Sequence, residues 1–589
     1  MSLRAPRRPR ADFDPAPHRA ELTAILEAVA AEPDLDARCL DRILRRHPRA
    51  GRGLFSKSEL IAGVRAFGAD GALDEGELVR RLRLRPVRTL SGVTPVTVLT
   101  KPFPCPGACV FCPNDVRMPK SYLADEPGAQ RAEDNRFDPY LQTWNRLAAY
   151  RSMGHPTDKV ELIVLGGTWS HYPEPYQRWF VRRCFEALND FGAGRDRREA
   201  AGAAPADYAS LAPLSGGALR AGDYNRAIRG KLGADCEGAL LHPSEHSDES
   251  ALEVAQRANE SAGARCVGLV LETRPDRIDT AELRRLRRLG ATKLQLGVQS
   301  LDEGLLSRNQ RGHGVEATRR AFRLARGAGF KLHAHWMPNL LGATPESDAA
   351  DYRRLFDDAD FRPDELKIYP CMLVESAELA RHHARGAWRP YDDTTLAALL
   401  ADCIASAPRW VRLTRVVRDF SAHDIWAGTH TANLREVVER ELARRGVPIC
   451  EIRHRELRGA APSAGLRLVT RAYASSVGEE RFLEWIDAED RLAGFLRLAL
   501  PRGEPVFEEL AGCALLREVH VYGASLELGA REPGAVQHAG LGRALVEEAA
   551  HQARAAGFET LAVIAAVGTR PWYRRLGFGG DGLYPRRAL

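Results

Sequence analysis

The spacing of apolar residues changes along the chain, and each change predicts a different structural unit. From about residue 18 to 85 apolar residues recur at helical spacing, as in AELTAILEAVA and LDRILRRH, which predicts a small helical region over 18–88. Residues 1–17 are rich in Arg and Pro and show no apolar period. We therefore expect a disordered basic tail there.

In the middle of the chain, short apolar runs alternate with helical segments. The runs are KVELIVLGGT, ARCVGLVLETRPD, TKLQLGVQS, FKLHAHWMPNLLG and DELKIYP, and stretches such as TAELRRLRRLG separate them. This β-α repetition predicts an α/β fold whose parallel strands close into a full or partial TIM-type barrel over 89–395. Functional groups should lie at the C-terminal ends of those strands. An Ala/Gly/Arg-rich stretch at 192–240 is typical of a surface insertion.

The last part of the chain has a third pattern. LRLVTRAYASS, RFLEWIDAEDRLAGFLRLAL and REVHVYGASLEL are typical of antiparallel strands, and a helix from Gly542 and the strand LAVIAAVG follow them. We expect an α+β domain over 461–589. The segment 396–460 is then a linker region between the two domains.

Composition is that of a globular protein with several cores. The chain has 589 residues, 44% hydrophobic and 28% charged, and contains no uninterrupted apolar run of the ~18 residues that a membrane span needs. The basic N-terminus MSLRAPRRPR is not followed by an apolar stretch of the kind that secretory signals contain. We therefore expect a cytoplasmic protein with reduced cysteines and no membrane partner.

The positive charge is concentrated near the N-terminus. The net charge is +7, and residues 1–90 hold 18 Lys and Arg against 13 Asp and Glu. Segments such as RILRRHPRAGRG suit a phosphate backbone, although a solvated helical face would have the same composition. Arg greatly outnumbers Lys throughout the chain.

Three cysteines lie close together in KPFPCPGACVFCPND. Cys105, Cys109 and Cys112 are the only dense group among eleven cysteines. A disulfide would leave one thiol over in a reducing compartment, and no nearby Cys or His supplies the fourth ligand of a structural zinc. Three thiolates on a [4Fe-4S] cluster leave one iron open to a substrate, so we interpret the loop as a cluster site.

The cysteine loop, ahead of a β-α barrel, resembles that of the radical S-adenosylmethionine (SAM) enzymes. In that superfamily the open iron binds SAM, and reductive cleavage releases a 5′-deoxyadenosyl radical. Gly166, Gly167 and Thr168 end a predicted strand in the way the superfamily's glycine motif does, although a plain tight turn would look the same. Glu272 and Gln299 would project from strand ends toward the ribose or carboxylate of SAM, or cap those strands.

QHAGLGRAL has the Q-x-x-G-x-G form that opens a helix at a pyrophosphate. It follows REVHVYG and precedes LAVIAAVG and PWYRRLGF, an order that resembles the GNAT acetyltransferases. In such a domain Tyr573 would lie near the thioester sulfur and could protonate a leaving thiolate. Tyr573 and His520 could equally be core residues.

The pairing of both patterns resembles the Elp3 family, the catalytic subunits of Elongator, in its stand-alone prokaryotic form. Matching strings include SGVTPVTVLTKP, CVFCP, HAHWMPNLLG and GTRPWYRRLGF. The resemblance implies 5-carboxymethyluridine synthesis at U34 in a tRNA anticodon stem-loop. Acetyl-CoA would be the carbon donor: its methyl group loses hydrogen to the deoxyadenosyl radical, the carbon radical adds to C5, and the thioester is hydrolysed.

The resemblance also implies roles for individual residues. Lys159 would contact acetyl-CoA from the radical domain and act with His520 and Tyr573 in catalysis. The acetyl-CoA site would comprise Lys159, Glu518, Val519, His520, Val521, Gln537, Gly540, Leu541, Gly542, Arg543 and Tyr573.

The chain departs from the family at two places. Trp572 replaces one of two adjacent tyrosines found in eukaryotic members, and VPICEIRHREL offers only Cys450 and His454 where many members have a zinc loop. A structural zinc is therefore not expected. A protein lysine acetyltransferase with the barrel as scaffold is the alternative function, and an RNA-binding scaffold with a vestigial cluster is a third.

Overall fold

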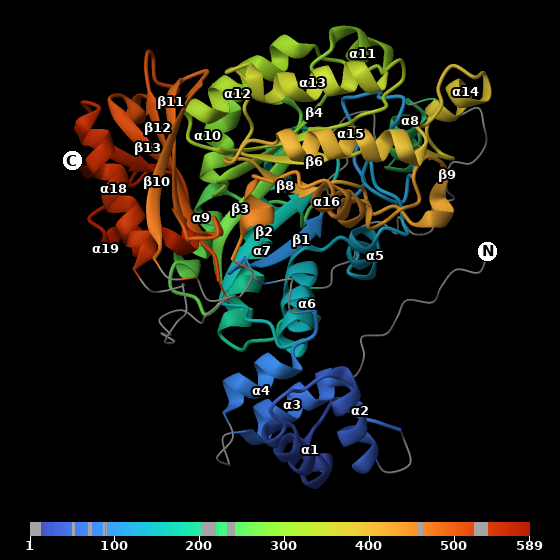
Figure 1. The fold of residues 1–589 in the computed structure, drawn as a ribbon, viewed down its shortest axis with the longest axis vertical. Coiled ribbons are helices and arrows are strands. Elements are labelled where there is room, and N and C mark those ends of the chain that lie inside the picture. Colours follow the sequence, from blue (N-terminus) through green and yellow to red (C-terminus); the bar gives the residue numbers. More distant parts are fainter. Residues whose placement is uncertain are drawn as a thin grey trace.

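The computed structural model describes residues 13–49, 53–68, 74–85, 89, 91–201, 220, 222–232, 242–457, 463, 465–523 and 540–589. Three units are distinct in Figure 1: a blue helical unit at the bottom, a central parallel sheet with its helices, and a red-orange, mostly antiparallel sheet at one side. Among the described residues, no helix combines the length and apolar character needed to cross a bilayer.

The N-terminal unit contains α1 (Arg19–Ala31), α2 (Ala37–Arg46), α3 (Lys57–Phe67) and α4 (Glu75–Leu82). These helices enclose their own apolar core. A capping box of Ser56 and Glu59 fixes the start of α3, since it satisfies backbone N–H groups that a helix end leaves free. Phe13, inside the predicted disordered tail, packs edge-on against Phe55, and residues 1–12 lie outside the described part.

The central sheet is parallel and open. Its strand order is β1-β2-β3-β4-β5-β6-β8, and the two edge strands do not pair with each other, so the fold is a partial barrel, as predicted. The strands are β1 (Thr94–Leu99), β2 (Lys159–Leu165), β3 (Arg265–Thr273), β4 (Lys293–Gln299), β5 (Lys331–Trp336), β6 (Glu365–Ile368) and β8 (Arg412–Arg415).

Helices cover the outer face of this sheet because their apolar sides share its core. They include α6 (Pro139–Ser152), α7 (Glu174–Gly192), α9 (Glu249–Asn259), α10 (Thr280–Arg288), α12 (Val315–Gly327), α13 (Pro345–Asp357), α15 (Asp393–Ser406) and α16 (Leu434–Arg444). Shorter elements are α5 (Pro127–Asp134), α8 (Asp223–Leu232), α11 (Glu303–Arg308), α14 (Leu379–Ala384), α17 (Ile452–Arg455) and the small sheet of β7 (Leu373–Val374) and β9 (Ile425–Ala427).

Two segments differ from the expectation from sequence. The predicted linker 396–460 contains β8, which pairs in parallel with β6, so the barrel sheet continues beyond residue 395. The short run VRLTR, with charged residues inside it, hid this strand. Within the predicted insertion 192–240, the described residues 223–232 form α8, which packs Tyr224 and Ile228 against Val116.

The C-terminal sheet is mixed. Its strands are β10 (Arg467–Ser475), β11 (Gly478–Ile486), β12 (Leu492–Pro501), β13 (Cys513–Val521), β14 (Thr560–Val563) and β15 (Arg586–Ala588), in that order across the sheet. The helices α18 (Leu541–Ala555) and α19 (Arg570–Arg575) lie against it. Only β13 and β14 run parallel, and this pair forms the centre of the domain's site.

Candidate functional site

One cavity of about 740 Å³ connects the two sheets. Described residues from the C-terminal half of the barrel that line it include Cys112, Tyr122, Glu272, Gln299, His335 and Lys367. The N-terminal ends of the strands, which form the barrel floor, contribute Glu161, Lys293, Lys331, Glu365 and Arg412. The antiparallel sheet and the elements after it contribute Glu518, Val519, His520 and Tyr573.

The three cysteines lie in the loop after β1, and α8 fixes that loop. The Cys105 backbone N–H donates to Asn225 Oδ1 at 2.9 Å, and Asn225 Nδ2 donates to the Cys105 carbonyl at 2.7 Å. The Tyr224 hydroxyl donates to the Met118 carbonyl at 2.8 Å. Part of the predicted insertion therefore positions a cysteine of the loop, a role that its composition did not indicate.

The spacing of the thiols fits a cluster better than a single ion. Among the described residues, only Asp125, His423 and Asp424 bring three potential ligand atoms within 4.8 Å of one another. The three cysteine sulfurs are therefore more widely spread than a zinc ion allows, since Zn–S bonds of ~2.3 Å keep its sulfur ligands about 4 Å apart. A [4Fe-4S] cluster binds its thiolates through separate irons and does not require them to lie that close together.

Two buried guanidinium groups flank Cys109. Arg311 Nη1 donates to Cys109 Sγ at 3.5 Å, and Arg274 Nη1 is buried without a hydrogen-bond partner. A side chain at Gly107 would collide with the Arg274 guanidinium, which explains glycine there. Two fixed cations beside the thiols suit thiolates and an anionic group, so these residues fit the cluster.

The residues predicted for SAM surround this loop on several strand ends. Gly166 and Gly167 follow β2 with φ of +116° and +66°, a backbone region that favours glycine. The hydroxyl of Thr168 lies 3.8 Å from Cys105 Sγ. Gln299 ends β4 with φ of +72°, and its buried Oε1 has no partner among the residues that the structure describes. Glu272 lines the cavity, whereas Gly166, Gly167 and Thr168 lie outside its wall.

Four polar side chains contact one another in the middle of the cavity, those of Lys367, Gln295, His335 and Glu272. Gln295 Oε1 accepts a hydrogen bond from Lys367 Nζ at 2.6 Å and lies 3.1 Å from His335 Nε2, while Glu272 Oε1 lies 3.7 Å from His335 Nδ1. Burial lowers the pKa of Lys367 to about 7, although Glu272 opposes this shift. Burial also raises the pKa of Glu272. Lys367 can therefore gain or lose a proton near neutral pH.

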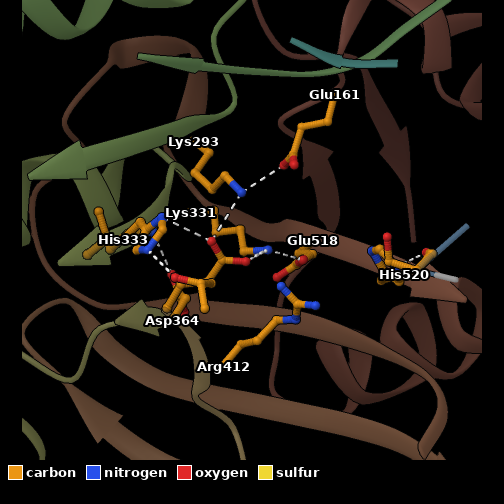
Figure 2. Close-up of polar contacts among 12 residues, drawn as sticks. Glu161, Lys293, Lys331, His333, Asp364, Arg412, Glu518 and His520 are labelled. Carbon is orange, nitrogen blue, oxygen red and sulfur yellow. Dashed lines mark hydrogen bonds and ion pairs between the residues drawn. The ribbon is translucent and has the colours of Figure 1, made fainter. Parts of the chain in front are cut away.

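Charged side chains form the barrel floor, where they meet the second domain (Figure 2). Lys293 Nζ lies 2.7 Å from Glu161 Oε1 and 3.1 Å from Glu365 Oε2. Lys331 Nζ lies 2.7 Å from Glu365 Oε1 and also contacts Glu518 on β13. One carboxylate, that of Glu365, thus holds both ammonium groups, and Glu518 connects them to the second domain.

Strand β13 separates from β14 at the acetyl-CoA residues that the sequence predicts. Its pairing with β14 ends at Leu516↔Val563, whereas its pairing with β12 continues to Val521. Within the described residues, Glu518–Val521 therefore have one edge that β14 does not pair. An open edge of this kind can donate backbone hydrogen bonds to an extended ligand.

The predicted catalytic side chains of this domain are buried beside that edge. Tyr573 lines the cavity, and burial raises its pKa, so the phenol remains protonated. His520 Nε2 lies 2.7 Å from the Ser91 carbonyl, which assigns the ring proton to Nε2, and burial lowers the His520 pKa. Although burial opposes it, Lys331 and Arg497 lower the pKa of Glu518, which stays ionised.

Helix α18 begins beside the end of β13. Gly540 precedes it with φ of +88°, and a Cβ at Gly542 would lie 3.6 Å from both Val521 and Trp572. Leu541, Gly542 and Arg543 thus form its first turn, close to Val521 but outside the cavity wall. Gln537 lies outside the described residues.

Three further residues considered from the sequence do not line the cavity. Lys159 is the first residue of β2, and strand alternation places it on the same face as Glu161, which does line the cavity. Burial lowers the pKa of Lys159. Cys450 and His454 lie around the start of α17, and neither belongs to a group of three metal-ligand residues in the described part of the chain.

Sequence reasoning missed the floor residues and Lys367, which lies in the middle of the cavity. Lys293, Lys331 and Glu365 each begin a strand, as the strings TKLQL, FKLHA and DELKI show. A charged residue at the start of three successive apolar strands was the available signal. It was ambiguous, because solvated residues commonly precede buried strands.

Family models match the barrel. The Radical SAM superfamily model matches residues 242–353, and the Radical_SAM C-terminal domain model matches residues 363–444. The second match includes β8, in agreement with the extended sheet. A radical SAM domain implies a [4Fe-4S] cluster and SAM, in agreement with the geometry of the cysteine loop.

Curated relatives cover most of the chain. It is 38% identical over 499 residues to the tRNA uridine(34) acetyltransferase of Dehalococcoides mccartyi (strain CBDB1), covering 83% of this chain and 96% of the relative. It is 32% identical to Elongator complex protein 3 of Drosophila melanogaster, covering 91% and 90%. The solved structure of archaeal Methanocaldococcus infernus Elp3, with residues 1–46 deleted, superposes with a TM-score of 0.66 at 32% identity, covering 85% of this chain and 99% of that one.

Proposed function

Because the chain belongs to the Elp3 family, we propose that it modifies uridine 34 of tRNA, forming 5-carboxymethyluridine with acetyl-CoA as the carbon donor. The tRNA substrate and the position of the modified uridine are taken from the names of the relatives. The observation that carries the proposal is the single cavity, since it joins Cys112 of the radical domain to Tyr573 of the acetyltransferase-like domain.

The radical half of the reaction belongs to the C-terminal end of the barrel. Cys105, Cys109 and Cys112 would hold the cluster, with Gly166, Gly167, Thr168, Glu272 and Gln299 around SAM. Together these groups supply a 5′-deoxyadenosyl radical, which can take hydrogen from an unactivated methyl group. The protein's part is to exclude water and to hold the reacting carbon close by.

The acyl half belongs to the second domain. Acetyl-CoA would lie along the edge of Glu518–His520 that β14 does not pair, with its pyrophosphate at the start of α18 and its thioester facing the cavity. Tyr573, which is protonated at neutral pH, would donate a proton to the thiolate that leaves on hydrolysis. His520 and Lys159 complete the proposed catalytic set.

The tRNA would lie against the basic helices of 18–88 and the mouth of the barrel. Arg42, Arg46 and Arg415 are exposed on these surfaces. Such contacts bind the phosphate backbone without reading sequence, so binding should weaken as salt rises. Uridine 34 would leave the anticodon stack to enter the cavity.

Isotope transfer tests the proposal. Anaerobically reconstituted enzyme is incubated with tRNA, SAM, a reductant and acetyl-CoA carrying ¹³C in its methyl carbon, and nucleosides and protein peptides are then analysed by mass. We expect ¹³C in 5-carboxymethyluridine. Label on protein lysines with none in tRNA would instead establish the alternative, a protein lysine acetyltransferase.

A further inference from the structure

We propose that Lys293 and Lys331 bind the acyl carbonyl oxygen of acetyl-CoA at the barrel floor and fix the methyl group in front of the radical site. This inference rests on the proposed function, because it assigns residues to the acyl part of that co-substrate. Nothing in the sequence motifs marks either lysine.

Donor arithmetic is the first argument. An ammonium group has three N–H donors. Lys293 donates two hydrogen bonds, to Glu161 and Glu365, whereas Lys331 donates one to Glu518 and pairs with Glu365 Oε1 at 2.7 Å. The contacts among the described residues therefore leave at least one donor on each lysine. Both side chains line the cavity, so a group inside it can accept these two hydrogen bonds (Figure 2).

Position is the second argument. Glu365 Oε1 contacts Lys331 and Oε2 contacts Lys293, so one carboxylate holds the two ammonium groups side by side. Glu518 places Lys331 against β13, where that strand separates from β14. The thioester of a ligand on the open edge of β13 would thus face both lysines. A carbonyl oxygen has two lone pairs and can accept one bond from each.

Charge is the third argument. Burial disfavours the ammonium form, but Glu161 and Glu365 outweigh it and raise the pKa of Lys293. Likewise, although burial opposes it, Lys293 and Lys331 hold the pKa of Glu365 well below its ordinary value. Lys293 therefore remains a charged donor at neutral pH. A charged donor also stabilises the oxyanion that forms when water attacks the thioester.

Residue choice is the fourth argument. Only eight of the 85 Lys and Arg residues are lysine, and three of these eight line the cavity. Elsewhere in the interdomain network the chain uses arginine, as Arg497 and Arg517 show. For ion pairing alone, arginine would serve at the floor as well. A compact ammonium leaves room for an acyl group, whereas the planar guanidinium would fill it.

A pair of ligands isolates the carbonyl. Acetyl-CoA and S-ethyl-CoA differ only in that oxygen, and their affinities are measured by calorimetry on the full-length, reconstituted protein without tRNA. Wild-type protein should prefer acetyl-CoA by roughly tenfold or more, as expected for a hydrogen bond to a charged group. Lys331→Gln and Lys293→Gln should each reduce that ratio at least threefold, while the affinity for S-ethyl-CoA changes less than twofold.

Controls separate carbonyl binding from structural loss. Lys367→Met removes the third cavity lysine, which donates to Gln295 and not to a floor carboxylate, and should leave the ratio unchanged. Because Lys331→Gln removes one positive charge from the floor, the charge-balanced variant Lys331→Gln/Glu518→Gln is measured as well. An unchanged ratio in these floor variants would overturn the assignment.

A spectroscopic readout needs no variant. Infrared difference spectra of bound acetyl-CoA with ¹³C in the carbonyl should show the carbonyl stretch displaced to lower frequency than in water. A stretch at or above its position in water would overturn the proposal. If acetyl-CoA binds with the displaced stretch but no label reaches tRNA, the proposed function fails and this assignment stands; label transfer without the displacement gives the reverse result.

Discussion

The two ends of the cavity are built in opposite ways. At the C-terminal end of the barrel, one short loop provides Cys105, Cys109 and Cys112, and residues outside this loop only hold it in place. At the floor, Lys293, Lys331, Glu365 and Glu518 come from four different strands and two domains. A local motif can be read from a sequence, whereas a site assembled from distant strands exists only in the fold. The chemistry we propose requires both ends to share one cavity.

The largest effect is expected when one thiol of the cysteine loop is removed. We expect Cys109→Ser to abolish SAM cleavage and carboxymethyluridine formation, because the remaining two thiols of the loop cannot hold the cluster. Acetyl-CoA affinity should change less than twofold, since that ligand is bound at the other end. Cys450→Ser, outside the loop, is the control and should keep the brown colour of the iron-sulfur cluster. Uridine modification by a colourless Cys109→Ser protein would contradict the account.

The connection between the domains should be the next most sensitive feature. Arg517 is fully buried and pairs with Asp364 of the barrel and with Glu480 at 2.8 Å. Arg517→Met leaves both carboxylates without this partner, so we expect a loss of about 3 to 5 kcal/mol in the free energy of unfolding. Denaturant titration checks this. Arg45→Met, at an exposed position, should leave the midpoint of that titration unchanged.

A smaller effect is expected at the acyl end. Tyr573→Phe removes the proposed proton donor and should lower the rate of carboxymethyluridine formation about a hundredfold. SAM cleavage in the absence of tRNA and the affinity for acetyl-CoA should remain near wild type. Trp572→Phe, next to it in α19, serves as the control. Equal rates for Tyr573→Phe and wild type would remove Tyr573 from the catalytic set.

The smallest expected effect is a shift in the pKa of Lys367, which lies between the two ends of the cavity. Lys367 has a pKa of about 7 in the folded protein against 10.5 for an ordinary lysine side chain, so the unfolded state binds more protons between these values. Stability from this group therefore rises with pH across that window. Glu272→Gln removes a charge that favours the ammonium form and should lower the Lys367 pKa by about one unit.

Lysine ¹³Cε resonances report this titration directly, since the chain has few lysines to resolve. Glu441→Gln, on the exposed part of α16, should leave the Lys367 midpoint unchanged. An upward shift in Glu272→Gln would show that another group controls Lys367.

These differences explain how far the sequence predicted the molecule. Period-2 and helical patterns predicted the α/β barrel and the α+β domain, because burial of one face imposes those periods. They missed β8, since its four residues, RLTR, show no apolar run. Asn225 escaped notice because its role depends on where α8 packs, and Lys331 because its partner Glu518 lies 187 residues away. Local chemistry was visible, whereas long-range pairing was not.

The central claim is that a radical formed at the cysteine end reaches an acetyl group held at the other end of the same cavity. Acetyl-CoA with a fully deuterated methyl group tests it most directly, with tRNA present and 5′-deoxyadenosine analysed by mass. The account predicts 5′-deoxyadenosine that carries one deuterium. Efficient formation of 5′-deoxyadenosine without deuterium, in a reaction that still modifies uridine 34, would contradict it.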